Sequence, residues 1–154
     1  MKPIAVFYND DQNAPKTTRP AHLGVNAYVQ WQDKLLMEKR WDCEIWGLPG
    51  GGVKAGETER HAIARELWEE TRLRIPESAF QKVRVYGNPG RVASYRDGSV
   101  WRMVIVQYHV VLDREPKLTL SRESKQMRFF TQQELEELPI VPTHRDIVMD
   151  FWNE

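Results

Sequence analysis

The sequence predicts a mixed α/β fold in a single domain. Segments rich in β-branched and aromatic residues lie before and after one strong helix pattern, and two short helix patterns close the chain. A length of 154 residues, 41% of them apolar, suits one globular core. Cys43 is the only cysteine, which excludes a disulfide framework within one chain. We therefore expect one domain over residues 1–154, with residues 1–20 as an N-terminal arm.

The expected strands are apolar alternating segments bounded by turn residues. Within the arm, residues 4–7 are apolar enough for a short strand. Residues 100–112 are β-branched and aromatic, which predicts a central strand, and Asp97-Gly98 before them is a hairpin signal. The other expected strands cover residues 22–31, 35–40, 82–86, 91–95 and 126–130.

Three helices are expected. Residues 58–71 form the strongest candidate, with Thr58 as N-cap, whereas the glycines just before it predict a loop over residues 49–52. Two later segments have the capping-box pattern, in which Thr is followed by an acid three residues later: Thr131 with Glu134 and Thr143 with Asp146.

Charge and hydropathy exclude several classes of function for this protein. Lysine plus arginine and aspartate plus glutamate balance at 22 each, which argues against a general nucleic-acid binder. No apolar run approaches the roughly 18 residues of a membrane span. The N-terminal apolar stretch is too short for a secretory signal, so we expect a cytoplasmic protein without membrane contact.

Three acids on the strong helix favour a metal site. At 100° per residue, Glu66, Glu69 and Glu70 fall within an arc of about 100° on one face. Such carboxylates repel one another, and a hard divalent cation such as Mg²⁺ would convert the repulsion into coordination. Arg65 and Glu57 are close enough in sequence to pair at the start of the helix. On the helix alone, a solvated acidic face is the simpler interpretation.

The glycines and acids together resemble the signature of the Nudix hydrolase family. The matching positions are Gly51, Glu57, Arg65-Glu66-Leu67, Glu69-Glu70 and Leu73, and Trp46-Gly47-Leu48-Pro49-Gly50 before them is also typical of the family. One position departs from the pattern, because Arg72 stands where the family has a glycine that ends the helix in a left-handed conformation. We therefore expect this helix end to be remodelled or mildly strained.

The resemblance implies a Nudix-type α/β/α sandwich with a mixed central sheet, and hydrolysis of the pyrophosphate bond in a nucleoside diphosphate linked to another moiety. It also implies a metal site for Mg²⁺ (or Mn²⁺), with Glu66, Glu69, Glu70 and the carbonyl of Gly50 as ligands. Arg65 would orient Glu66 and pair with Glu57. The general base would be one of the motif glutamates or a glutamate on a distant loop, for which Glu123 is the candidate.

Substrate contacts and assembly are less determined. Arg40 and Trp41 end a strand near the glycine loop, whereas Arg91 and Tyr95 follow Pro89 in the region where family members bind their substrate. The expected partner is a small-molecule nucleotide, namely a nucleoside triphosphate, ADP-ribose or a nucleotide sugar. A homodimer is compatible with the resemblance. A non-catalytic nucleotide sensor of the same fold remains the alternative, favoured only by Arg72.

Overall fold

The computed structural model describes residues 5–41, 44–122 and 124–153. In these residues the strands are β1 (Ala5–Asn9), β2 (His22–Trp31), β3 (Lys34–Arg40), β4 (Trp46–Gly47), β5 (Gly50–Gly52), β6 (Gln81–Tyr86), β7 (Arg91–Tyr95), β8 (Val100–Leu112) and β9 (Ser124–Phe130). The helices are α1 (Glu59–Thr71), α2 (Gln132–Glu136) and α3 (Pro142–Asp150), with short 3₁₀ turns η1 (Glu77–Ala79) and η2 (Phe151–Asn153).

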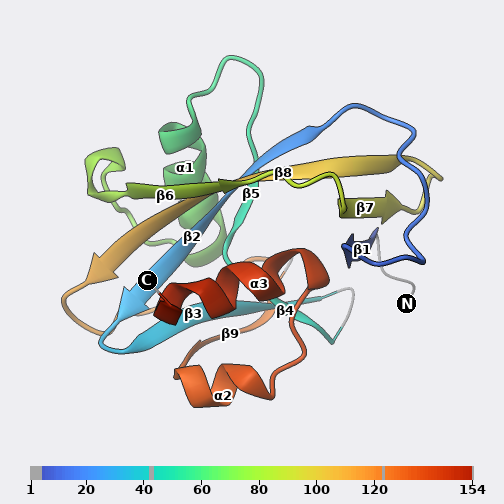
Figure 1. Cartoon of the computed structure of the whole chain (residues 1–154). Helices are drawn as coiled ribbons and strands as arrows, with labels where there is room; N and C mark the ends of the chain where they lie inside the picture. The colour runs from blue at the N-terminus through green and yellow to red at the C-terminus, as the bar shows by residue number, and fades with distance from the viewer. Residues whose placement is uncertain (1–4, 42–43, 123, 154) are drawn as a thin grey trace.

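The described strands join into one mixed sheet (Figure 1). Its main path runs β1-β7-β8-β2-β3-β4, while β5, β6 and β9 pair with β2, β8 and β3 respectively. Strands β2 and β8 are parallel from His22 opposite Met103 to Trp31 opposite Leu112, and the other paired strands are antiparallel. The expected mixed sheet with a central strand over residues 100–112 is therefore confirmed.

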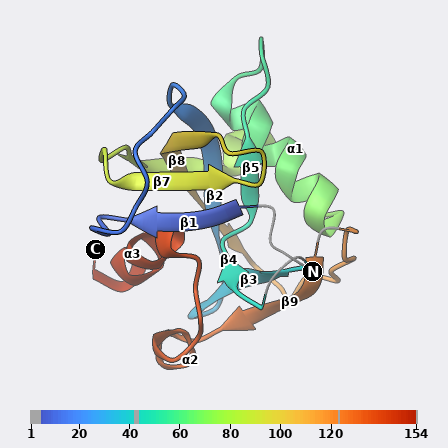
Figure 2. The ribbon, with the colours of Figure 1, turned by 90° about the vertical axis from the view of Figure 1, so that its right-hand side faces the viewer.

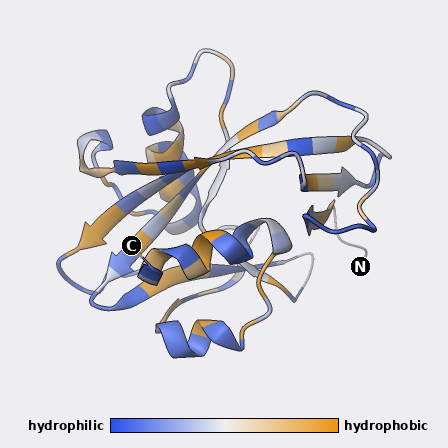
Figure 3. Ribbon diagram, viewed as in Figure 1, coloured by the Kyte–Doolittle hydropathy of each residue, from blue (hydrophilic) through white to orange (hydrophobic). Residues whose placement is uncertain are grey.

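Helices cover both faces of this sheet. In Figure 2, α1 and α3 lie on opposite sides of β2 and β8. Successive side chains of a strand point to opposite faces, so Val25, Ala27 and Val29 pack in the core that contains α1, whereas Tyr28 packs with Ile147 of α3. Hydrophobic and hydrophilic residues alternate along α3 (Figure 3), as expected for a helix with one face on the sheet. The α/β/α layering is thus confirmed.

Helix α1 begins and ends at defined caps. The Thr58 hydroxyl accepts a hydrogen bond from the His61 N–H at 3.1 Å, which confirms the expected N-cap. At the other end Arg72 adopts φ 64° and ψ 17°, and its N–H donates to the Trp68 carbonyl at 2.8 Å. Arg72 therefore keeps the left-handed helix end that glycine usually provides. Its guanidinium carbon lies 4.3 Å from the centroid of the Trp68 ring, so the side chain packs back on the helix.

One of the two expected capping boxes is present. Thr131 and Glu134 exchange both hydrogen bonds of the motif at the start of α2. The prediction for Thr143 and Asp146 was wrong, because α3 begins at Pro142, a residue whose fixed φ suits the first helical turn. The Asp146 carboxylate instead binds Arg91, as described below.

The N-terminal segment is part of the sheet. Residues 5–9 of the expected arm form β1, which pairs antiparallel with β7 of the same chain (Figure 2).

None of the described helices has the length and apolar character that a membrane crossing requires.

Candidate active site

The glycines before α1 form a strand rather than the expected loop. Strand β5 pairs antiparallel with β2, with Gly50 opposite Asn26. A Cβ on Gly50 would lie 2.0 Å from the Val25 carbonyl oxygen, and one on Gly51 would lie 2.3 Å from the carboxyl carbon of Glu66. Both contacts are far shorter than ordinary van der Waals distances. At Gly50 the obstacle is backbone, so only glycine fits there, whereas at Gly51 it is the end of the Glu66 side chain, which would have to move.

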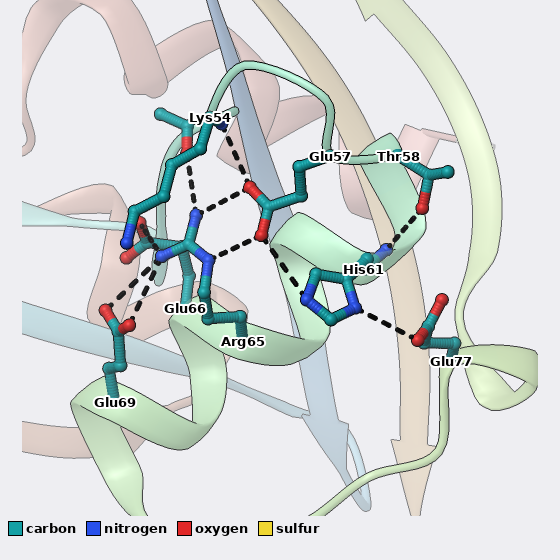
Figure 4. Close-up of polar contacts among 9 residues, drawn as sticks. Lys54, Glu57, Thr58, His61, Arg65, Glu66, Glu69 and Glu77 are labelled. Atoms are coloured by element: carbon teal, nitrogen blue, oxygen red, sulfur yellow. Dashed lines mark hydrogen bonds and ion pairs between the residues drawn. The ribbon is translucent and has the colours of Figure 1, made fainter.

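Arg65 connects α1 to the segment before it (Figure 4). Its Nε and Nη2 donate to the two carboxylate oxygens of Glu57 at 2.6 and 2.9 Å, a bidentate pair. Nη2 also donates to the Gly52 carbonyl at 3.0 Å. Hydrogen bonds from Arg65 and from the Lys54 N–H lower the pKa of Glu57 to about 2. Glu57 is thus ionised near neutral pH, and it fixes the position of the guanidinium.

The remaining nitrogen of that guanidinium faces the acids of α1. Arg65 Nη1 donates to Glu66 at 3.0 Å and to the two oxygens of Glu69 at 3.3 and 3.4 Å (Figure 4). In the part of the chain that the structure describes, no three histidine, cysteine, aspartate or glutamate side chains are arranged as a ready metal site. Two of the expected metal ligands therefore share Arg65 in this conformation.

Glu70 points to the interior of the site. Its carboxylate accepts a hydrogen bond from the Gly50 N–H at 2.9 Å, and the residue is only 8% exposed. Burial raises the pKa of Glu70 well above its usual value, and the nearby carboxyl groups of Glu38 and Glu66 raise it further. The negative charges gathered here are costly to bury without a cation or a proton.

A cavity of about 300 Å³ lies beside β5 and the end of α1. Its polar lining includes Asn26, Glu38, Arg40, Glu70, Tyr95 and His144. Burial raises the pKa of the Tyr95 hydroxyl, while the charge of Arg40 acts on it in the opposite direction. Arg40 and Tyr95, expected from the sequence to contact substrate, therefore both face this space.

His144 is a half-buried part of the cavity wall. Its Nδ1 accepts a hydrogen bond from the Leu48 N–H at 3.1 Å, and its Nε2 lies 3.2 Å from the side-chain amide of Asn26. Burial lowers the pKa of His144 to about 4, and the positive charges of Arg91 and Arg40 act in the same direction. The imidazole is therefore neutral near pH 7.

Arg91 has a structural position, which corrects its expected role in substrate binding. The side chain is 1% exposed, and its guanidinium binds Asp146 through two nitrogens at 2.6 and 3.0 Å. It also donates to Asn88 and to the Thr143 carbonyl, so Arg91 ties β7 to α3.

Two further residues expected from the sequence are not placed at the cavity by the described part of the chain. Trp41 lies in the turn after β3 and is not among the described residues that line it. Glu123, the candidate distant base, lies outside the described residues.

Sequence reasoning missed Glu38, Asn26 and His144. Glu38 stands two residues before Arg40, and residues at that spacing in a strand share a face, so the choice of Arg40 could have indicated it. The pairing of Asn26 with His144 joins residues 118 positions apart and has no local signal.

Comparison with known proteins identifies the family. The family model for the NUDIX domain matches residues 20–151, and the chain belongs to this family. A MutT-like protein from Streptomyces ambofaciens is 41% identical over 74 residues, which are 47% of each chain. An ADP-ribose pyrophosphatase from Methanocaldococcus jannaschii is 29% identical over 133 residues, 84% of this chain and 72% of that protein.

Comparison with solved structures agrees with this family assignment. The crystal structure of a bifunctional NMN adenylyltransferase/ADP ribose pyrophosphatase from Francisella tularensis superposes with a TM-score of 0.72 at 25% identity. The match covers 92% of this chain and 42% of that protein. The chain thus aligns with less than half the length of the Streptomyces ambofaciens protein and of the Francisella tularensis enzyme.

Proposed function

We propose that the protein is a Mg²⁺-dependent (or Mn²⁺-dependent) pyrophosphohydrolase that cleaves a nucleoside diphosphate linked to another moiety. Membership in the NUDIX family supports this activity. One observation carries the proposal: Glu70 lines a cavity of about 300 Å³ and accepts a hydrogen bond from Gly50, while the Glu66 carboxylate lies against Gly51, whose backbone lines the same cavity. Such a wall combines acids with bare backbone, as a site for metal-bound phosphates requires.

The residues present fit a divalent cation. Glu66, Glu69 and Glu70 would hold it, with the Gly50 carbonyl as a further ligand. Support comes from Glu70, because burial and then the neighbouring carboxyl groups of Glu38 and Glu66 raise its pKa, and a bound cation would favour its ionised form. When bound, the ion neutralises phosphate charge and lowers the pKa of a coordinated water. Arg65 would then keep Glu66 in place while remaining paired with Glu57.

The protein's own groups would position the substrate. Arg40 is suited to a phosphate, since its forked donors match phosphate oxygens. Tyr95 lines the same cavity as Arg40, and, against the effect of burial, the charge of Arg40 acts to lower the pKa of its hydroxyl, which supports a shared role in substrate contact. Trp41 remains a candidate for a contact at the rim, and Glu123 remains the candidate for a base supplied by a loop.

The sensor alternative loses its one argument. It was favoured only by Arg72, yet Arg72 ends α1 in the left-handed conformation with the usual hydrogen bond to Trp68. The acids upstream keep their helix. Hydrolysis is therefore the function that the site supports best.

A metal-dependent assay tests the proposal. Cleavage of a panel of nucleoside triphosphates, ADP-ribose and nucleotide sugars, followed by chromatography of the nucleoside monophosphate formed, should require Mg²⁺ or Mn²⁺ and stop with a chelator. Glu69→Gln and Glu70→Gln should each lose several orders of magnitude in kcat while their unfolding transitions stay cooperative. Glu59→Gln is the matched control, because Glu59 lies on α1 and pairs with Lys82 instead. Full turnover by both site variants, or tight nucleotide binding without hydrolysis by the wild type, would refute the proposal.

A further inference from the structure

Phe7, on the N-terminal strand β1, reaches the wall of the cavity beside β5. Its ring lies against the guanidinium of Arg40, whose Cζ is 5.6 Å from the ring centroid. This distance is within the range of a cation–π contact. Both side chains are half-buried, so the contact is partly shielded from water. The N-terminal segment, expected from the sequence as an arm, therefore contributes a side chain to the candidate active site.

The curl of the sheet brings these two side chains together. On the main path of the sheet, β7, β8 and β2 lie between β1 and β3. In a flat sheet, strands separated in this way would be roughly 19 Å apart, because neighbouring strands are about 4.8 Å apart. In Figure 1 and Figure 2, the sheet curls so that β1 lies between β7 and β4. Phe7 and Arg40 thus close the cavity from two distant parts of the sheet.

The register of β1 fixes the direction of the Phe7 side chain. In the antiparallel pair of β1 and β7, Phe7 lies opposite Ala93. Tyr95 is two residues beyond Ala93 on β7, and residues at that spacing in a strand share a face. Phe7 and Tyr95 therefore project to the same side of the sheet, where both line the cavity together with Arg40.

A cation–π contact suits an arginine that binds a phosphate. A long side chain loses rotamer freedom when it is immobilised on a ligand, and this loss weakens binding. A ring face attracts the guanidinium and limits its freedom before the ligand arrives. Contact with a ring face uses none of the N–H donors of the guanidinium, and phosphate recognition depends on those donors.

We propose that Phe7 is a positioning residue for Arg40. It holds the guanidinium at the cavity wall, where Arg40 binds a phosphate oxygen of the substrate. The inference rests on the proposed function for the role of Arg40 and for the identity of the substrate. It adds that the N-terminal strand serves substrate affinity as well as the sheet.

The test compares KM and kcat of Phe7→Leu with those of the wild type on a panel substrate that is cleaved. Leucine keeps an apolar side chain without a ring face, so KM should rise about threefold to tenfold. Because Arg40 would hold the substrate equally before and during the reaction, kcat should stay within about twofold. Phe7→Tyr keeps the ring and should restore the wild-type KM. Val6→Ala is the matched control, because Val6 is the neighbouring residue on β1 and is 47% exposed.

A double-mutant cycle shows whether Phe7 acts through Arg40. Arg40→Met keeps much of the apolar stem and removes the charge, so it should raise KM by itself. Adding Phe7→Leu to Arg40→Met should change KM no further, because no guanidinium remains to be held. A purely structural role of Phe7 would instead make the two effects multiply. Thermal unfolding checks that each variant is folded.

Three results would overturn the inference. The first is a Phe7→Leu protein with the wild-type KM. The second is a pair of effects, from Phe7→Leu and Arg40→Met, that multiply. The third is a Phe7→Tyr protein that binds substrate no better than Phe7→Leu.

Failure of the proposed function would look different. If the wild type cleaves no member of the panel, that function is refuted, and the same variants are compared by their Kd for ADP, measured by isothermal titration calorimetry with Mg²⁺. Coupling between positions 7 and 40 in this Kd would leave the role of Phe7 standing. Independent effects, or a wild type that does not bind ADP, would overturn it.

Discussion

Gly51→Ala is expected to separate catalysis from folding. A Cβ at this position would lie 2.3 Å from the carboxyl carbon of Glu66 and 2.4 and 2.6 Å from its two oxygens. Ordinary contact with a Cβ begins at 3.4 Å, so the carboxyl group must move by about 1.1 Å. Because Arg65 donates to the same carboxylate at 3.0 Å, that hydrogen bond must change as well.

The size of this shift sets the expected loss. Misplacing a group at a reacting centre by about 1 Å can cost about a hundredfold in rate. The clash involves the end of a flexible side chain rather than backbone, so the cost in the free energy of unfolding should stay within the range of about 1–3 kcal/mol for an overpacked site. We therefore expect Gly51→Ala to lose about a hundredfold in kcat and to remain folded.

The assay compares metal-dependent formation of nucleoside monophosphate with urea unfolding. Gly87→Ala is the control, because a Cβ there meets its nearest atom, in Val104, at an ordinary 3.6 Å. That variant should match the wild type in both measurements. If Gly51→Ala keeps wild-type kcat, the contact between β5 and Glu66 does not matter for catalysis and the reasoning fails.

Two stability predictions concern other parts of the chain. Arg72→Gly removes left-handed strain of about 1–2 kcal/mol, whereas Arg72→Ala keeps the strain and loses the contact with Trp68. Urea unfolding should find the glycine variant more stable than the alanine variant by about 1 kcal/mol, and equal stabilities would contradict the strain. For His144, the folded pKa of about 4 lies below the usual 6.5, so the unfolded chain binds a proton first as the pH falls. Relative to His144→Asn, the wild type should lose about 3 kcal/mol between pH 7 and pH 4, and a constant difference would refute the burial argument.

The elements of the fold could largely be predicted from local sequence. Strands over residues 22–31, 91–95 and 100–112 match the observed β2, β7 and β8, because apolar alternation and turn residues act within a few positions. The N-cap of α1 could also be predicted from the few residues around Thr58. The glycine segment 49–52 was wrongly expected as a loop, since its pairing with β2 depends on the space between that strand and Glu66 rather than on strand propensity.

The cavity could be predicted only in part. The motif acids follow from helix geometry, but the partner of a charged residue depends on which distant segment packs against it. Arg91 illustrates the difficulty, because a candidate for substrate binding is instead buried against Asp146, 55 residues away. His144 and Asn26 meet over 118 residues for the same reason. Substrate preference depends on such long-range contacts, so it has no short signature in the sequence.

Arg65 has two separate roles in the geometry of the site. Its Nε and Nη2 are occupied by Glu57 and by the Gly52 carbonyl, and these contacts hold the guanidinium in place. Only Nη1 reaches Glu66 and Glu69. A cation bound by those two acids would therefore compete with one nitrogen of Arg65 and leave its anchor to Glu57 intact. This division would let Arg65 compensate the charge of the two acids and still stay anchored if a cation bound them.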